Sequence, residues 1–175
     1  MIISVEELKK FITTNKADEV LEGMLQALEL SVREYTHNNF QIRGIRSIGK
    51  VEDGILYCDT SMLKDGDTVE ISDSLYNAGL LVIANMAEGQ IPWEGAIDEG
   101  EVLVTKVVYP ADVKMGVVNM MKWDLENREK VGIQSETISR HSVTYFNMDG
   151  DNSMMGYPKS LLGFLRPYKK ASRRF

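Results

Sequence analysis

Residues 109–145 read YPADVKMGVVNMMKWDLENREKVGIQSETISRHSVTY, and the first half of this stretch predicts the central helix of the chain. Pro110 suits the first helical position, because its ring fixes a helical φ and its missing N–H has no partner there. Gly132 is the expected end. Apolar residues recur at helical spacing along one face, bordered by Trp123: Val113, Gly116, Val117, Met120 and Met121. A face this wide must be covered, which is typical of a core helix.

Asp124 is an exception, because it falls near the middle of the apolar face. A buried carboxylate is costly unless it accepts hydrogen bonds. Either the end of the helix is open to water here, or another group donates to Asp124.

The chain has 175 residues, of which 43% are hydrophobic. This suffices for a core and fits one domain, or one domain with an insertion. The apolar runs are too short for a membrane span, and the charged start is unlike a signal peptide. The single cysteine, Cys58, excludes an internal disulfide, and its place in an apparent strand predicts a small buried side chain. We expect a protein that is made in the cytosol.

Charge is distributed unevenly along the chain. The net charge is −6, yet five of the 20 Lys and Arg residues lie in the last ten positions, where there is no acid. The rest of the chain therefore carries 15 basic and 26 acidic residues. An acidic body repels nucleic acid, whereas a basic end can reach phosphates or an acidic protein. The end is either a solvated tail or an interaction segment.

Two helices are predicted before residue 40. Ser4 and Glu7 have the spacing of a capping box, and Asp18 is the expected N-cap of a longer helix over residues 18–36. Leu30 stands on its polar side and suits a subunit contact. Its apolar face comprises Val20, Leu21, Met24, Leu25, Leu28, Val32 and Tyr35. We expect this face to pack against the central helix.

Residues 41–109 change to short β-rich runs: IRGIRSI, GILYCD, DTVEIS, GLLVIANM and EVLVTKVVY. Residues 65–67 and 77–79 are typical of tight turns, and Pro92 of a break or an edge. We expect an antiparallel sheet or small barrel, inserted into a discontinuous helical domain of residues 1–40 and 110–157. The expected fold class is therefore α+β.

The last part of the chain is mixed. Residues 142–146 favour a strand, whereas residues 134–140 are either extended or a turn. Pro158 is expected to open a short helix that stops before Pro167. Residues 158–175 join this apolar helix to five basic residues, which is typical of a docking arm.

No catalytic motif is evident. The sequence lacks a phosphate-binding glycine loop, paired Cys or His ligands and a nucleophile elbow. His37 and His141 have no ligand at zinc spacing, and residues 149–152 lack the oxygen spacing of an EF-hand. Glu136 and His141 could form an acid–base pair, but no nucleophile accompanies them. We expect no enzyme, metal or cofactor.

The order of these features resembles the head–tail connector (adaptor) family of long-tailed bacteriophages. The matching segments span nearly the whole chain: SVEELKKFI, LEGMLQALELSVREYTHNNF, KDGDTVEIS, VLVTKVVYPADVK, KVGIQSETISRHSVTY and GYPKSLLGFLRPYKKASRRF. KDGDTVEIS and YNAGLLVI resemble the β-insertion of some connectors. GLLVIANMAEGQIPW departs from the family by being more hydrophobic after the turn, which bears on the strand pairing of the insertion.

The resemblance implies a structural protein of the virion neck, made in the host cytoplasm. It implies a ring of about twelve copies, which needs two different patches on each subunit. The ring would dock under the portal, extend the DNA channel and offer a platform for the tail completion protein. DNA would pass without specific binding, as an acidic body favours, and no membrane would be involved.

The candidate site residues follow from these expectations. The subunit-interface candidates are Leu30, Glu34, Met120, Trp123 and Asp124. The arm would place apolar side chains in a groove of a neighbour or of the portal and pair its cations with acidic groups there. Its residues are Leu161, Leu162, Phe164, Leu165, Arg166, Tyr168, Lys169, Lys170, Arg173 and Arg174. Deleting residues 158–175 should then leave a folded protein that no longer joins filled heads.

Two other functions are open. A soluble binding module would hold a peptide or sugar on the β-insertion, where Tyr76 and Trp93 either line the site or pack turns. A hydrolase would use Glu136, His141 or the aspartates of residues 149–151. Ligand-dependent stabilisation would indicate the first, and turnover lost in His141→Ala the second.

Overall fold

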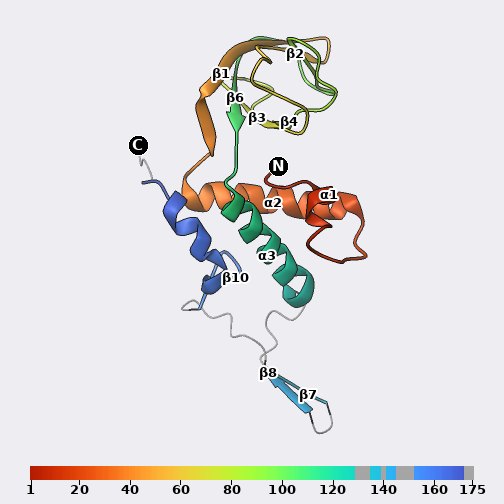
Figure 1. Cartoon of the computed structure of the whole chain (residues 1–175), viewed down its shortest axis with the longest axis vertical. Coiled ribbons are helices and arrows are strands. Elements are labelled where there is room, and N and C mark those ends of the chain that lie inside the picture. Colours follow the sequence, from red (N-terminus) through yellow and green to blue (C-terminus); the bar gives the residue numbers. More distant parts are fainter. Residues whose placement is uncertain (129–134, 139–140, 145–151, 172–175) are drawn as a thin grey trace. The chain divides into compact units, whose positions relative to one another are not determined.

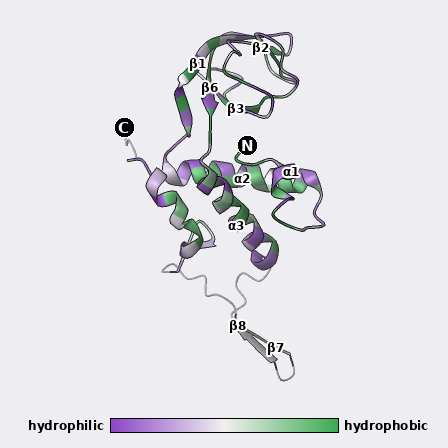
Figure 2. Cartoon of the chain, in the orientation of Figure 1, coloured by the Kyte–Doolittle hydropathy of each residue, from purple (hydrophilic) through white to green (hydrophobic). Residues whose placement is uncertain are grey.

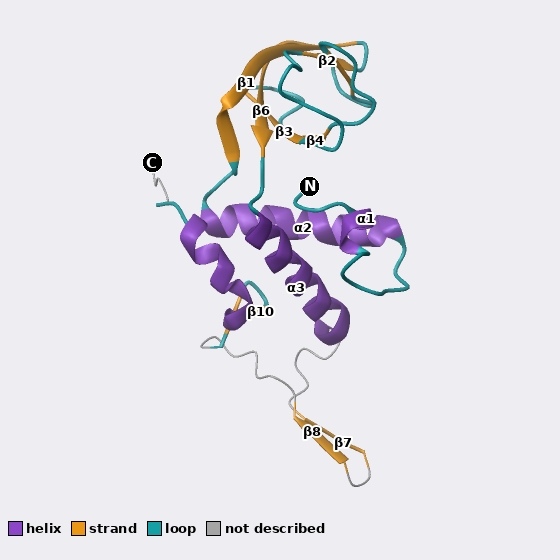
Figure 3. Cartoon of the chain, viewed as in Figure 1, coloured by secondary structure: helices purple, strands orange, loops and turns teal. Residues whose placement is uncertain are grey.

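A computed structural model describes residues 1–128, 135–138, 141–144 and 152–171 (Figure 1). The chain divides into two compact units. One unit holds Met1 and residues 39–109, and the other holds residues 2–38 and 110–175. Figure 3 shows the strands of the first unit and the helices of the second. This combination of helices with an antiparallel sheet confirms the α+β class.

The first unit, called the β unit below, is a curled six-stranded sheet joined by antiparallel pairings. Its strands lie in the order β4-β3-β6-β1-β2-β5. They are β1 (Gln41–Glu52), β2 (Ile55–Tyr57), β3 (Thr68–Ser72), β4 (Gly79–Val82), β5 (Gln90–Pro92) and β6 (Glu99–Val107). The sheet encloses a core of its own, made of Val51, Leu56, Val69, Ile71, Ile83, Ile91, Val102 and Val104.

The β-rich runs of the sequence overlap five of these strands. The sixth, β5, has only three residues, which is too short for an alternating pattern. Pro92 ends β5 at the edge of the sheet, as predicted, because an edge strand tolerates a residue without an N–H. The turn at residues 65–67 is confirmed, since Gly66 has a φ of 85° and the Asp67 N–H donates to the Lys64 carbonyl. The second predicted turn is wrong, because Gly79 already begins β4 after a longer loop.

The second unit, called the helical unit, contains α1 (Val5–Leu8), α2 (Asp18–Thr36), α3 (Ala111–Asn127) and a 3-10 helix, η2 (Lys159–Tyr168). The predicted bounds of α2 are confirmed, although its N-cap is Ala17. Pro110 is the N-cap of α3, not its first residue, and the expected end at Gly132 lies outside the described residues. The expected stop before Pro167 is wrong, because the φ fixed by proline is also compatible with a 3-10 helix.

Contacts among α1, α2, α3 and η2 form the core of the helical unit. α2 and α3 pack against each other, as predicted, and η2 contacts both of them. The buried residues of α3 are Val113, Gly116, Val117, Val118, Met120 and Met121. Figure 2 shows α3 changing from hydrophobic in its first turns to hydrophilic at its C-terminal end.

The remaining described strands are short. β7 (Ser135–Ile138) pairs with β8 (His141–Thr144), so the expected strand is confirmed for residues 142–144. β9 (Ser153–Met154) pairs with β10 (Tyr157–Pro158). Among the described helices, none is both long and apolar enough to cross a membrane.

Candidate interaction surfaces

Asp124 is bonded within its own chain at the end of α3. The hydroxyl of Tyr157 donates to its carboxylate, and the guanidinium of Arg128, one turn later, pairs with it. Burial and the bond to Asp124 raise the pKa of Tyr157. Of the two alternatives for this carboxylate, the one in which another group donates is therefore confirmed.

Arg128 extends this cluster to two aromatic rings. Its guanidinium lies 5.1 Å from the ring centroid of Trp123 and 4.8 Å from that of Tyr157. Its Nη1 also donates to the Gly156 carbonyl at 3.1 Å. Cations above aromatic rings are attracted to the negative face of the ring. Trp123 and Asp124, expected at a subunit interface, thus join α3 to the segment that precedes η2.

Met120 requires a correction, because its side chain is fully buried. It cannot face a neighbouring subunit unless the helical unit opens. The sequence placed Met120 correctly on the apolar face of α3, but could not show that this face is covered within the same chain.

The apolar part of the expected arm is likewise covered within the chain. Leu162 is 3% exposed and Leu165 is 0% exposed, whereas Leu161 is half-buried. Phe164 lies over Gly116 of α3. The expectation that these side chains fill a groove in another molecule is therefore wrong for Leu162 and Leu165. The apolar face of η2 packs against α2 and α3 of the same chain, which removes it from water.

Polar residues at the end of η2 and directly after it are held at the ends of α2 and α3. The Tyr168 hydroxyl donates to the Asp112 carboxylate at 2.7 and 2.8 Å. Lys169 places its ammonium 4.2 Å from the ring centroid of Tyr35. The Lys170 N–H donates to the Thr36 carbonyl at 2.8 Å. Arg166 is exposed, and Arg173 and Arg174 lie outside the described residues.

An exposed stripe runs along α2 on the side away from its buried face. We call it the α2 stripe; its residues follow one another three or four apart and are Val20, Gly23, Ala27, Leu30 and Glu34. Leu30 is 64% exposed and Val20 is 50% exposed. Both expected interface residues on this helix, Leu30 and Glu34, belong to the stripe. Val20 was assigned to the buried face, so that assignment is wrong, and the spacing of the small residues is the signal that would have found the stripe.

The two ends of α2 differ in charge, although the exposed Glu34 lies in the last turn beside the lysines. Glu19 and Glu22 are exposed in the first turns of the helix. Lys169 and Lys170 are exposed beside its last turn, where Tyr35 and Thr36 hold them. Cations near the C-terminal end of a helix are also favoured by the helix dipole.

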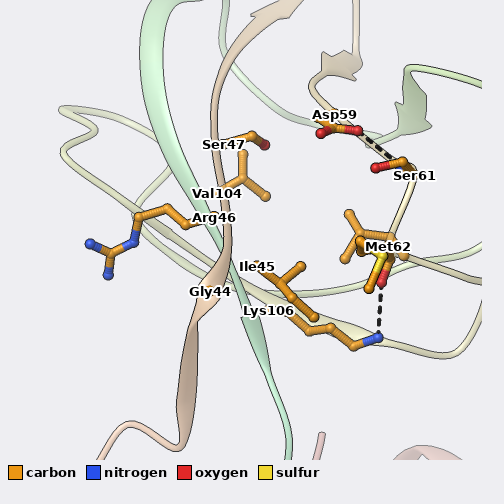
Figure 4. A pocket seen from close by; sticks show the side chains of 10 residues that line it. Gly44, Ile45, Arg46, Ser47, Asp59, Ser61, Met62, Val104 and Lys106 are labelled. Carbon is orange, nitrogen blue, oxygen red and sulfur yellow. Dashed lines mark hydrogen bonds between the residues drawn. The ribbon is translucent and has the colours of Figure 1, made fainter.

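A small cavity in the β unit offers little room for a ligand. Its volume is about 70 Å³, which is space for a few water molecules. Figure 4 shows its lining, in which the Lys106 ammonium donates to the Met62 carbonyl at 3.1 Å. The same ammonium pairs with Asp67 at 2.7 Å, and Asp59 accepts from the Ser61 N–H at 2.9 Å. The charged groups of the cavity are thus already bonded within the unit.

The structure bears on two of the candidate chemical groups, the Cys58 thiol and possible metal ligands. Burial raises the pKa of the Cys58 thiol to about 11, so the thiol stays protonated near neutral pH. The described residues contain no cluster of His, Cys, Asp or Glu that could hold a metal ion. The side chains of Glu136 and His141, proposed as an acid–base pair, lie outside what the structure describes, as do Asp149 and Asp151.

The two aromatic residues of a possible binding module differ in their surroundings. Trp93 packs against the core of the β unit, whereas Tyr76 is 64% exposed. Trp93 is therefore a packing residue, and only Tyr76 presents an open surface.

No protein-family model matches this sequence, and no curated protein matches it at a significant level.

Proposed function

We propose that this chain is a structural subunit of the neck of a long-tailed bacteriophage. About twelve copies would form a head-to-tail ring, a closed arrangement that uses two different patches on each subunit. The ring docks under the portal, extends the DNA channel and carries the tail-side completion protein. The helical unit forms the wall, the β unit is an insertion, and no reaction is catalysed.

The observation that carries the proposal is that α2 combines an exposed apolar stripe with acidic residues at one end and basic residues at the other. α2 has 19 residues, and it is therefore about 28 Å long. Two like ends repel each other, whereas the acidic end of one copy attracts the basic end of the next. Such a polarity disfavours a parallel pairing of two α2 helices, in which like ends would meet. It is compatible with an antiparallel pair and with a head-to-tail contact, and the head-to-tail contact is the one that closes into rings.

The α2 stripe supplies the apolar part of the same contact. Residues spaced three and four apart form the seam of packed helices, and small residues let two helices approach closely. A Cβ added at Gly23 would meet nothing within 4 Å, so the stripe is open at this residue. The acidic balance of the chain agrees with a channel through which DNA slides, because phosphate contacts to cations make DNA binding strong.

Mixing the purified chain with the portal protein of the same phage tests the proposal. Light scattering should show a complex whose mass includes several copies of the chain. Leu30→Glu should prevent this assembly, because it places a charge in the centre of the apolar seam. Ile48→Glu is the matched control, since Ile48 is 66% exposed in the β unit, against 64% for Leu30. A portal that binds no copies, or a complex equally sensitive to both variants, contradicts the proposal.

A charge exchange tests separately whether the acidic end of one copy meets the basic end of another. Lys169→Glu with Lys170→Glu should weaken assembly, because two acidic ends then meet. Adding Glu19→Lys and Glu22→Lys to the same chain should restore it, since the attraction is reversed but kept. If the four-fold variant assembles no better than the two-fold variant, the ends do not meet in the ring.

A further inference from the structure

The β unit presents an exposed apolar surface on two neighbouring loops, residues 73–78 and 93–98. Leu75 is 86% exposed, Tyr76 is 64% exposed and Ile97 is 53% exposed. We call these three residues the tip patch. Single exposed apolar side chains are common, whereas contiguous exposed apolar patches rimmed by polar residues mark interaction sites.

Asn77 joins the two loops. Its side-chain amide donates to the Ile97 carbonyl at 2.7 Å and accepts from the Ile97 N–H at 2.9 Å. Asn77 itself is only 7% exposed. The Asn77 side chain thus makes the two hydrogen bonds that a paired backbone residue makes in a β-sheet. These bonds fix Ile97 beside the loop that carries Leu75 and Tyr76.

Glu99 forms hydrogen bonds with the loop of residues 73–78. Its carboxylate accepts from the Ser74 hydroxyl and the Leu75 N–H, both at 2.6 Å, and from the Asn77 amide at 3.0 Å. These hydrogen bonds lower the pKa of Glu99, the Ser74 hydroxyl contributing most. The loops that carry the tip patch are therefore held in place by hydrogen bonds. A surface fixed in this way loses little conformational freedom when it binds.

The segment that carries the tip patch is acidic, whereas the neighbouring strand β1 brings a cation, Lys50, which pairs with Glu52. Residues 65–105 contain no Lys, Arg or His and nine acidic residues: Asp65, Asp67, Glu70, Asp73, Glu88, Glu94, Asp98, Glu99 and Glu101. Asp73, Glu94, Asp98 and Glu101 are exposed on or beside the two loops. Such a rim repels DNA phosphates and anionic lipid headgroups, and it attracts cations.

We propose that the tip patch binds a segment of a partner protein in which an apolar side chain is flanked by Lys or Arg. Leu75, Tyr76 and Ile97 contact the apolar side chain, and the acidic rim pairs with its cations. Tyrosine suits such a centre, because it offers a large contact area with few rotatable bonds. This inference does not depend on the proposed function.

Three short synthetic peptides labelled with a fluorophore test the inference by fluorescence anisotropy. The first alternates Lys and Leu, the second has Ser in place of Leu, and the third has Glu in place of Lys. The full-length chain should bind the first peptide at least about tenfold more tightly than either of the others, because both apolar and charged contacts are needed. Equal binding of the Ser peptide would show attraction by charge alone and would overturn the inference.

Variants locate the bound peptide. Leu75→Ser combined with Ile97→Ser should weaken binding of the Lys-Leu peptide at least about tenfold, since both side chains belong to the contact centre. Ile48→Ser is the matched control, because Ile48 is 66% exposed in the same unit but outside the two loops. Leu75→Ser alone, at the most exposed position, serves if the double variant does not fold. Unchanged binding in a folded Leu75→Ser variant, or an equal loss in Ile48→Ser, contradicts the inference.

Discussion

The ring of Phe164 lies so close to Gly116 that a Cβ added at residue 116 would stand 2.3 Å from the Cζ atom of Phe164. A separation this short does not occur between real side chains, so η2 can approach α3 here only because residue 116 has no side chain. Glycine inside a helix costs about 1 kcal/mol relative to alanine. The contact between the two helices offsets that cost.

Gly116→Ala should therefore destabilise the helical unit by about 1–3 kcal/mol, because the added methyl group displaces the Phe164 ring. Urea unfolding followed by circular dichroism measures the change. Gly23→Ala is the control: its Cβ meets nothing within 4 Å, and alanine should stabilise the helix by about 0.5–1 kcal/mol. Opposite signs are expected, so an equal effect of both substitutions would refute the close contact.

Leu165→Ala tests whether η2 belongs to the helical unit. Leu165 is fully buried, and its truncation should cost about 2–5 kcal/mol of unfolding free energy. Removal of residues 158–175 should accordingly unfold the helical unit, and not merely prevent attachment to filled heads as the sequence led us to expect. Denaturant unfolding of both variants supplies the measurement. A Leu165→Ala variant as stable as the parent chain would show that η2 is a detachable arm.

Acidification should loosen the loops of the tip patch through Glu99. Its folded pKa is lowered, chiefly by the Ser74 hydroxyl, so its contribution to stability is complete above the unfolded pKa of about 4.3. This contribution is lost as the pH falls through the pKa that Glu99 has in the folded chain. Amide exchange at Leu75 and Ile97 should then quicken in acid, relative to amides in the core strands. Glu99→Gln should remove most of this pH dependence. An NMR titration that gives Glu99 a pKa at or above the ordinary pKa of glutamate would contradict the prediction.

Cys58 should react slowly with iodoacetamide near neutral pH. Burial raises its pKa to about 11, and the thiolate is the reactive form. The native chain should react on the order of tenfold or more slowly than the chain in urea, as mass spectrometry would show. Equal rates in the two states would mean that the thiol is neither buried nor perturbed.

Sequence patterns predicted the elements whose signal is local. α2 and five strands of the β unit follow from the spacing of their own apolar residues, and Pro92 indicated an edge without any tertiary information. The contact between Gly116 and Phe164 could not be predicted in this way, because the two residues lie on segments far apart in the chain. The burial of Leu162 and Leu165 against α2 and α3 could not be predicted for the same reason.

The two sides of α2 show how tertiary packing changes a local pattern. Glu29 lies outside the predicted apolar face, yet it is 3% exposed, because α1, α3 and η2 all contact this helix and cover more than its apolar residues. Val20 was expected inside and is 50% exposed. Of the candidate interface residues, Leu30 and Glu34 stay on the surface, whereas Met120 does not.

The bond from Arg128 to the Gly156 carbonyl also affects how the chain can evolve. It joins the end of α3 to the residue before β10 at a Nη1–O distance of 3.1 Å. Doubling the length of a closed loop costs only about 0.6 kcal/mol. A longer chain between these two positions would therefore cost the bond from Arg128 to Gly156 little, and α3 and η2 could stay unaltered.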